Sequence, residues 1–166
     1  MLPEEAKAVA DHQRRRFNEL VDVFDRPQPP EVMARLREIV ASAELRPGAV
    51  VLDVGTGAGV LIPLVQSYQP SAVFVCAIFM NGMYGNIADK PAACGNAARM
   101  LRPGGRLVVS HPEGRAFVDQ LRATSDLFIE SLPTKEAFET VLKPLGLKVI
   151  EYRDEPKLYL MVARKS

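Results

Sequence analysis

The chain has 166 residues, of which 48% are hydrophobic and 25% are charged, and its formal net charge at pH 7 is +1. This length and composition predict one globular domain. The balanced charge gives no sign of a surface that binds nucleic acid. No apolar stretch reaches the length of a membrane span, and the first residues lack the basic-then-apolar order of a signal peptide. We therefore expect a cytoplasmic protein that binds neither nucleic acid nor a membrane.

Two helices are predicted ahead of the first strand. The first covers about residues 4–20 and the second about residues 31–43, and the proline-rich segment 26–30 separates them. Four apolar residues of the second helix are spaced so that they face inward: Val32, Leu36, Ile39 and Val40. We expect residues 1–45 to form a helical cap on an α/β core of residues 46–166.

The central stretch of the chain is an apolar run that ends in a carboxylate and continues through three alternate glycines. Ala49 to Leu52 predict a parallel strand that is buried on both faces and ends at Asp53. Glycines at positions 55, 57 and 59 allow positive φ and close approach of a ligand. A helix over residues 60–67 would direct its free N–H groups at that ligand. The pattern predicts a cradle for a nucleotide-like cofactor; a tight turn that needs glycine only for packing is the alternative, but it does not explain Asp53.

The remaining elements alternate between strands and helices. We predict strands at 72–80 and 106–110, with a helix at 89–101 that is stopped by residues 102–105, then helices at 113–123 and 134–145 and a strand hairpin at 147–153 and 158–164. Cys76 lies in a predicted strand and Cys94 in a predicted helix, so we expect both to be buried hydrophobic side chains. Two cysteines and two histidines do not make a metal site, and we expect none.

The segment from Asp53 to Gly59, which includes Thr56, resembles motif I of the class I S-adenosylmethionine (SAM)-dependent methyltransferases. It departs from the dinucleotide fingerprint G-x-G-x-x-G, because position 60 is Val60. Residues 101–109, Leu-Arg-Pro-Gly-Gly followed by an apolar run, are typical of strand five of the same family. The segment 17–25 resembles the entry segment of the ubiquinone/menaquinone methyltransferases, where it forms a lid; a helix that caps the sheet is the alternative.

The resemblance implies a fold, a cofactor and a set of roles. The fold is an α/β three-layer, Rossmann-like sandwich whose mostly parallel sheet ends in an antiparallel hairpin, and the cofactor is SAM. By position, Asp53 would hold the SAM amino group, and the loop with Gly55, Thr56, Gly57 and Gly59 would lie against its methionine part. Residues that follow later strands would complete the site: Asn81 with the cofactor, and Tyr84 and His111 as catalytic candidates. His111 would act as a base for a phenol or enol. For Asn81 and Tyr84 the alternative is a role in loop packing. For His111 the alternative is a structural hydrogen bond to a loop carbonyl.

Strands two and three of the family have no counterpart in this chain. Residues 54–88 contain no Asp or Glu, so the carboxylate that binds the ribose in the family is absent. If the other elements keep their family positions, the first crossover would be left-handed, against about 98% of known cases. Strand four could take the vacated place, the helix could change faces, or a second chain could swap in, and an exposed edge on strand one would invite a homodimer.

Two functions remain open. The first is SAM-dependent methyl transfer to a small-molecule acceptor, weakened by the missing region. The second is a non-catalytic methyltransferase-like protein, either a truncated form or a subunit that binds a partner.

Overall fold

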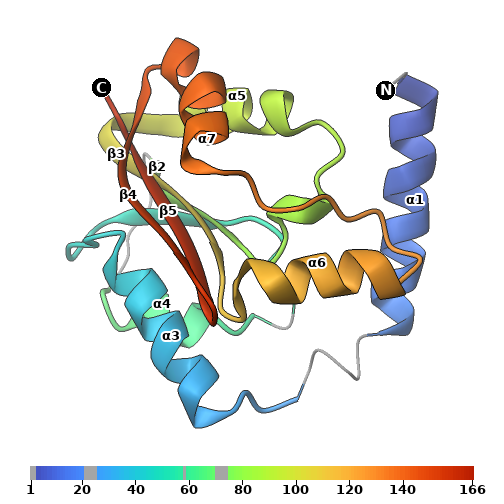
Figure 1. Cartoon of the computed structure of the whole chain (residues 1–166). Coiled ribbons are helices and arrows are strands. Elements are labelled where there is room, and N and C mark those ends of the chain that lie inside the picture. Colours follow the sequence, from blue (N-terminus) through green and yellow to red (C-terminus); the bar gives the residue numbers. More distant parts are fainter. Residues whose placement is uncertain (1–2, 21–25, 58, 70–74) are drawn as a thin grey trace.

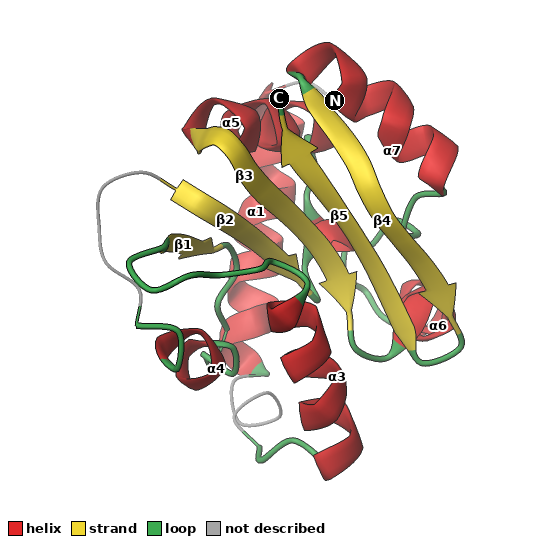
Figure 2. Cartoon of the chain, turned by 90° about the vertical axis from the view of Figure 1, so that its left-hand side faces the viewer, coloured by secondary structure: helices red, strands yellow, loops and turns green. Residues whose placement is uncertain are grey.

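Five strands form one sheet in the computed structural model, which describes residues 3–20, 26–57, 59–69 and 75–166. The strand order is β1-β2-β3-β5-β4, with β1 and β4 at the two edges (Figure 2). The strands are β1 (Val50–Asp53), β2 (Val75–Asn81), β3 (Leu101–His111), β4 (Leu147–Glu155) and β5 (Leu158–Lys165). The first three are parallel, and β5 pairs antiparallel with both β3 and β4. The predicted parallel sheet with a C-terminal hairpin is confirmed.

Within the part of the chain that the structure describes, six α-helices accompany the sheet; Figure 1 shows their arrangement. They are α1 (Pro3–Glu19), α3 (Pro30–Ala41), α4 (Ile62–Gln66), α5 (Lys90–Met100), α6 (Gly114–Thr124) and α7 (Lys135–Leu142). Short polar side chains fix two of the starting points: Asp89 accepts a hydrogen bond from the N–H of Ala92 at α5, and Thr134 accepts one from Ala137 at α7. A one-turn 3₁₀ helix, η1 (Tyr84–Asn86), follows β2.

The helices cover both faces of the sheet, which makes three layers. Successive residues of a strand point to opposite faces, and Phe79 accordingly packs with Leu36 of α3 and Leu61 beside α4. Its neighbour Ile78 packs on the other face with side chains of α5, α6 and α7, among them Cys94, Val118 and Phe138. The four predicted inward residues of α3 are all buried, so α3 is part of one helical layer.

The α6 helix is joined to the C-terminal hairpin through Arg115. Its guanidinium donates to the Asp154 carboxylate at 2.8 Å, to the Tyr152 hydroxyl at 2.7 Å and to the carbonyl oxygens of Leu132 and Pro133. One half-buried cation therefore links a helix, a strand and the loop that leads into α7.

β1 forms the edge of the sheet and is partly buried on both faces, where the sequence predicts full burial. All four of its residues are partly exposed, with Leu52 packed against the core on one face and Val51 against the core on the other, and β2 is its only partner among the described strands. The apolar run predicts a strand correctly, but a run of residues carries no information about neighbours that the chain lacks.

The crossovers on the two sides of β2 have opposite hands. β1, β2 and β3 are adjacent and parallel, so the connections β1–α4–β2 and β2–α5–β3 step in the same direction across the sheet. The first passes over the face covered by α3 and the second over the other face. One of the two is therefore left-handed, which is rare. β2 lies next to β1 without taking the place of the missing strands, and α4 stays on the face covered by α3. The left-handed crossover that the sequence predicts is therefore present.

Smaller differences concern the ends of elements. The helix expected over residues 60–67 is limited to Ile62–Gln66, and β2 begins at Val75, with residues 72–74 outside the described part. β3 begins at Leu101, where the sequence predicts a stop, because residues 102–105 bulge from the ladder: Leu101 pairs with Val75, and Arg106 already pairs with Ala77. No described helix has the length and apolarity to cross a membrane.

Candidate functional site

The glycine loop leaves the sheet where β1 ends. The N–H of Val54 donates to the carbonyl oxygen of Phe79 at 2.9 Å, and the chain then turns away from β2. All three glycines have positive φ, +72° at Gly55, +53° at Gly57 and +76° at Gly59, as the sequence predicts. Thr56 closes the turn, since its hydroxyl donates to the Asp53 carbonyl oxygen at 3.0 Å.

The three glycines have different surroundings. A Cβ atom on Gly55 would lie 3.0 Å from Cγ of Met83, and one on Gly59 would lie 3.0 Å from Cδ1 of Ile62. At Gly57 the nearest atom would be the Gly55 carbonyl oxygen at 3.9 Å. Side chains of the protein therefore cover two of the glycines, and Gly57 has open space in front of it for a ligand.

Asp53 is a half-buried carboxylate at the start of this loop. Its side chain has no hydrogen-bond donor or cation within the part of the chain that the structure describes. Burial raises its pKa from 3.8 to about 6, because the charged form loses hydration that no protein group replaces. Such a carboxylate is suited to a cationic partner from a ligand.

The ends of β2 and β3 lie next to the end of β1. Asn81 pairs with Ser110 in the ladder, and its side-chain carbonyl oxygen accepts a hydrogen bond from the Ser110 hydroxyl at 2.9 Å. Asp53 pairs with Phe79, two residues before Asn81. The fold thus brings Asp53, the glycine loop, Asn81 and His111 together at the carboxyl ends of the parallel strands β1, β2 and β3.

His111 ends β3 with a neutral ring. Burial lowers its pKa from 6.5 to about 4, and its Nδ1 accepts a hydrogen bond from the N–H of Glu113 at 3.2 Å. A neutral imidazole that accepts at Nδ1 carries its proton on Nε2. His111 therefore offers a hydrogen-bond donor, which does not favour the role of a base. The ring borders a small hollow of about 20 Å³ together with Gly82, Asn86 and Ile129, with room for about one water molecule.

Tyr84 lies in the hydrophobic core. Its side chain is 2% exposed, its hydroxyl is 3.6 Å from Sγ of Cys94, and its ring packs 5.1 Å from that of Phe138. Burial, with the Cys94 thiol nearby, raises its pKa far above the ordinary value. These contacts favour packing for Tyr84 and separate its hydroxyl from the glycine loop.

Two features near the carboxyl ends of these strands were not predicted from the sequence. Met83 covers Gly55, and no spacing rule points to it, because the contact depends on how the turn after β2 is folded. Segment 125–130 borders the small hollow through Ile129, and the sequence contains no motif there that would have pointed to it. No group of three or more His, Cys, Asp or Glu that could hold a metal occurs among the described residues.

No family model and no curated protein matches the sequence, but solved structures match the fold. A SAM-dependent methyltransferase from Aquifex aeolicus superposes with a TM-score of 0.67 at 15% identity, over 89% of this chain and 98% of that one. The chain has the fold of these methyltransferases.

Two other similar structures extend over almost the whole chain. One is the 1,6-didemethyltoxoflavin-N1-methyltransferase of Burkholderia thailandensis, with bound 1,6-didemethyltoxoflavin and S-adenosylhomocysteine; its TM-score is 0.66 at 19% identity, over 100% of this chain and 91% of that one. The other is from the complex between the Trm112 methyltransferase activator of Haloferax volcanii and a methyltransferase, with a TM-score of 0.66 at 13% identity over 96% of both chains. At these identities the likeness concerns the fold.

Proposed function

We propose that this protein is a SAM-dependent methyltransferase that acts on a small-molecule acceptor. The observation that carries the proposal is the unpartnered, half-buried Asp53 carboxylate at the start of a glycine loop that is open at Gly57. The amino group of SAM is a cation that would satisfy this carboxylate, and the open backbone at Gly57 would admit its methionine part.

The residues fit one end of SAM better than the other. Asp53 and Gly57 suit the amino-acid end, but residues 54–88 contain no Asp or Glu that could hold the ribose hydroxyls. The loss of such charge-assisted hydrogen bonds costs about 1.5–3 kcal/mol. We expect binding about tenfold to a hundredfold weaker than a complete site would give.

SAM, when bound, supplies an activated methyl group on a sulfonium centre, and methyl transfer needs alignment more than acid or base chemistry. The Nε2–H of His111 would donate to the substrate and position it, and Asn81 would border the cofactor. Because His111 already accepts a hydrogen bond at Nδ1, we propose an acceptor that ionises readily without a strong base. A phenol or enol of the quinone type, which the sequence analysis pairs with His111 as its base, meets this condition only when it is acidic enough to be ionised at neutral pH.

A non-catalytic role is the second candidate. It is favoured by the absence of acidic residues in 54–88 and by the exposed edge of β1, where a second copy of the chain could pair. One of the similar folds occurs in a complex with a methyltransferase activator, so a partner protein is compatible with this architecture. Light scattering that gives a monomer at all concentrations would exclude the homodimer.

Calorimetric titration with SAM tests the main proposal. We expect micromolar to sub-millimolar binding that is lost in Asp53→Ala and retained in Asp119→Ala, a matched change at an exposed carboxylate of α6. A folded wild-type protein that releases no heat at millimolar SAM would refute the cofactor assignment and favour the non-catalytic role.

A further inference from the structure

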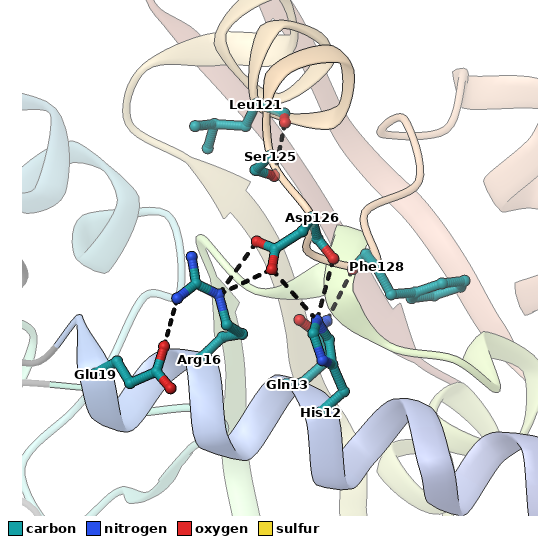
Figure 3. Close-up of polar contacts among 8 residues, drawn as sticks. All are labelled: His12, Gln13, Arg16, Glu19, Leu121, Ser125, Asp126 and Phe128. Atoms are coloured by element: carbon teal, nitrogen blue, oxygen red, sulfur yellow. Dashed lines mark hydrogen bonds and ion pairs between the residues drawn. The ribbon is translucent and has the colours of Figure 1, made fainter.

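The helix α1 lies outside the three layers, beside α6 (Figure 1). The polar contacts of its residues His12, Gln13 and Arg16 reach the segment that follows α6. Figure 3 shows His12, Gln13 and Arg16 rising from one face of α1 toward Asp126 and Phe128. Arg16 Nε donates to the Asp126 carboxylate at 3.1 Å, His12 Nε2 lies 3.2 Å from the Asp126 carbonyl oxygen, and Gln13 Nε2 donates to the Phe128 carbonyl oxygen at 2.8 Å.

This attachment is weak for a helix of 17 residues. Among the described side chains of α1, Gln13 alone is buried, with 7% of its surface exposed. Arg16 and Asp126 are 34% and 56% exposed, and ion pairs with this exposure contribute little. Most helices in proteins are held by an apolar face, whereas the buried side chain among those described for α1 is a polar amide.

The Gln13 amide is itself only half satisfied. Its oxygen, Oε1, is buried and has no hydrogen-bond partner in the described structure. The amide cannot be rotated to exchange the two atoms, because the carbonyl oxygen of Phe128 requires the nitrogen on its side. A buried acceptor without a donor opposes the docked arrangement, and an exception of this kind calls for an explanation.

The segment that α1 holds forms a wall of the candidate site. The Phe128 carbonyl oxygen also accepts a hydrogen bond from Nδ2 of Asn86 at 3.3 Å, and the N–H of Glu130 donates to the Gly85 carbonyl oxygen at 2.9 Å. Between them, Ile129 lines the small hollow beside His111. Segment 125–130 is thus held by η1 on one side and by α1 on the other.

We propose that α1 is a detachable latch: it leaves segment 125–130 while the sheet stays folded, and its release loosens the wall of the hollow beside His111. The half-satisfied Gln13 amide keeps the docked state close in free energy to the released state. The proposal does not depend on methyl transfer, so it stands or falls separately from the proposed function.

Hydrogen exchange followed by mass spectrometry on the full chain tests the latch. We expect amides of α1 to exchange well before those of β5, since a locally opening helix does not need global unfolding. Asp126→Asn removes the charge that faces Arg16 and His12, and it should speed exchange in α1 and in 125–130 about two- to fivefold. The matched control, Asp119→Asn, should leave both unchanged.

A second variant changes the latch in the opposite direction. Gln13→Leu removes the unsatisfied oxygen together with one hydrogen bond, so it should slow the exchange of α1 about two- to fivefold. Exchange of α1 in step with β5, or equal exchange in Asp126→Asn and Asp119→Asn, would overturn the proposal. Faster exchange in Gln13→Leu would overturn the role of Gln13 as the weak point.

Discussion

Replacement of Asp53 by Asn should stabilise the protein and at the same time weaken its binding of SAM. A rise of the Asp53 pKa from 3.8 to about 6 corresponds to about 3 kcal/mol, at about 1.36 kcal/mol per pKa unit. Because the side chain is only half-buried, solvent screening reduces this value, and we expect a gain of about 1–2 kcal/mol in the free energy of unfolding. SAM binding should weaken about tenfold to a hundredfold, as expected for a lost charge-assisted hydrogen bond.

The pH dependence of this gain has a definite sign. The folded state holds the Asp53 proton more tightly than the unfolded state, so the wild type loses stability as the pH rises from about 3.8 through 6. The amide introduced by Asp53→Asn does not titrate. The difference in the free energy of unfolding between the two proteins is therefore small below pH 4 and reaches its full value above pH 6. Urea denaturation at pH 4 and pH 7.5 measures the difference, and calorimetry measures SAM binding.

Two results would contradict this reasoning. If Asp53→Asn were less stable than the wild type at pH 7.5, the carboxylate would have a structural partner that stabilises its charge. If the stability gain were the same at both pH values, burial of the charge would not be its cause. Asp119→Asn, a change at an exposed position of α6, controls for the altered net charge.

Three further measurements probe the same site and its support. Gly57→Ala and Gly104→Ala both place a side chain at positive φ in open space, so urea denaturation should show that each loses about 1–2 kcal/mol of stability. Only Gly57→Ala should weaken SAM binding in calorimetry. Equal effects of the two changes on SAM binding would show that Gly57 is not part of the site. Arg115→Met removes the hydrogen bonds that join α6 to the hairpin and should cost about 2–4 kcal/mol of unfolding free energy, against almost none for the exposed Arg122→Met; a small loss would mean that the packing alone holds α6. The ring of His111 should titrate near pH 4 in an NMR titration assigned with His111→Gln; a midpoint near 6.5 would show that the ring is hydrated.

The local pattern of the sequence was sufficient where short-range physics decides the structure. The strand before Asp53, the positive φ of its three glycines and the start of α5 after Asp89 all follow from residue type and spacing. The inward face of α3 follows from its helical period. The arrangement at the carboxyl ends of the strands was predictable because parallel strands end at the same edge.

The sequence failed where a residue's neighbours come from distant segments. Met83 covers Gly55, and the hydroxyl of Tyr84 lies beside the Cys94 thiol; both contacts depend on how the turn after β2 is folded. The Pro103-Gly104 turn is accommodated as a bulge opposite β2, where Leu101 pairs with Val75 and Arg106 pairs with Ala77. β1 has the apolar composition of an inner strand but the position of an outer one.

The position of β1 gives this architecture a modular boundary. An open sheet can lose or gain strands at its edge without disturbing the remaining hydrogen-bond ladders, whereas a closed barrel cannot. The stretch between Gln69 and Val75 joins α4 to β2, and it is the natural graft point for an added strand–helix–strand unit of about 30 residues. Such a chimera would extend the sheet outward from β1, allow every crossover to be right-handed, and supply a new surface beside the glycine loop.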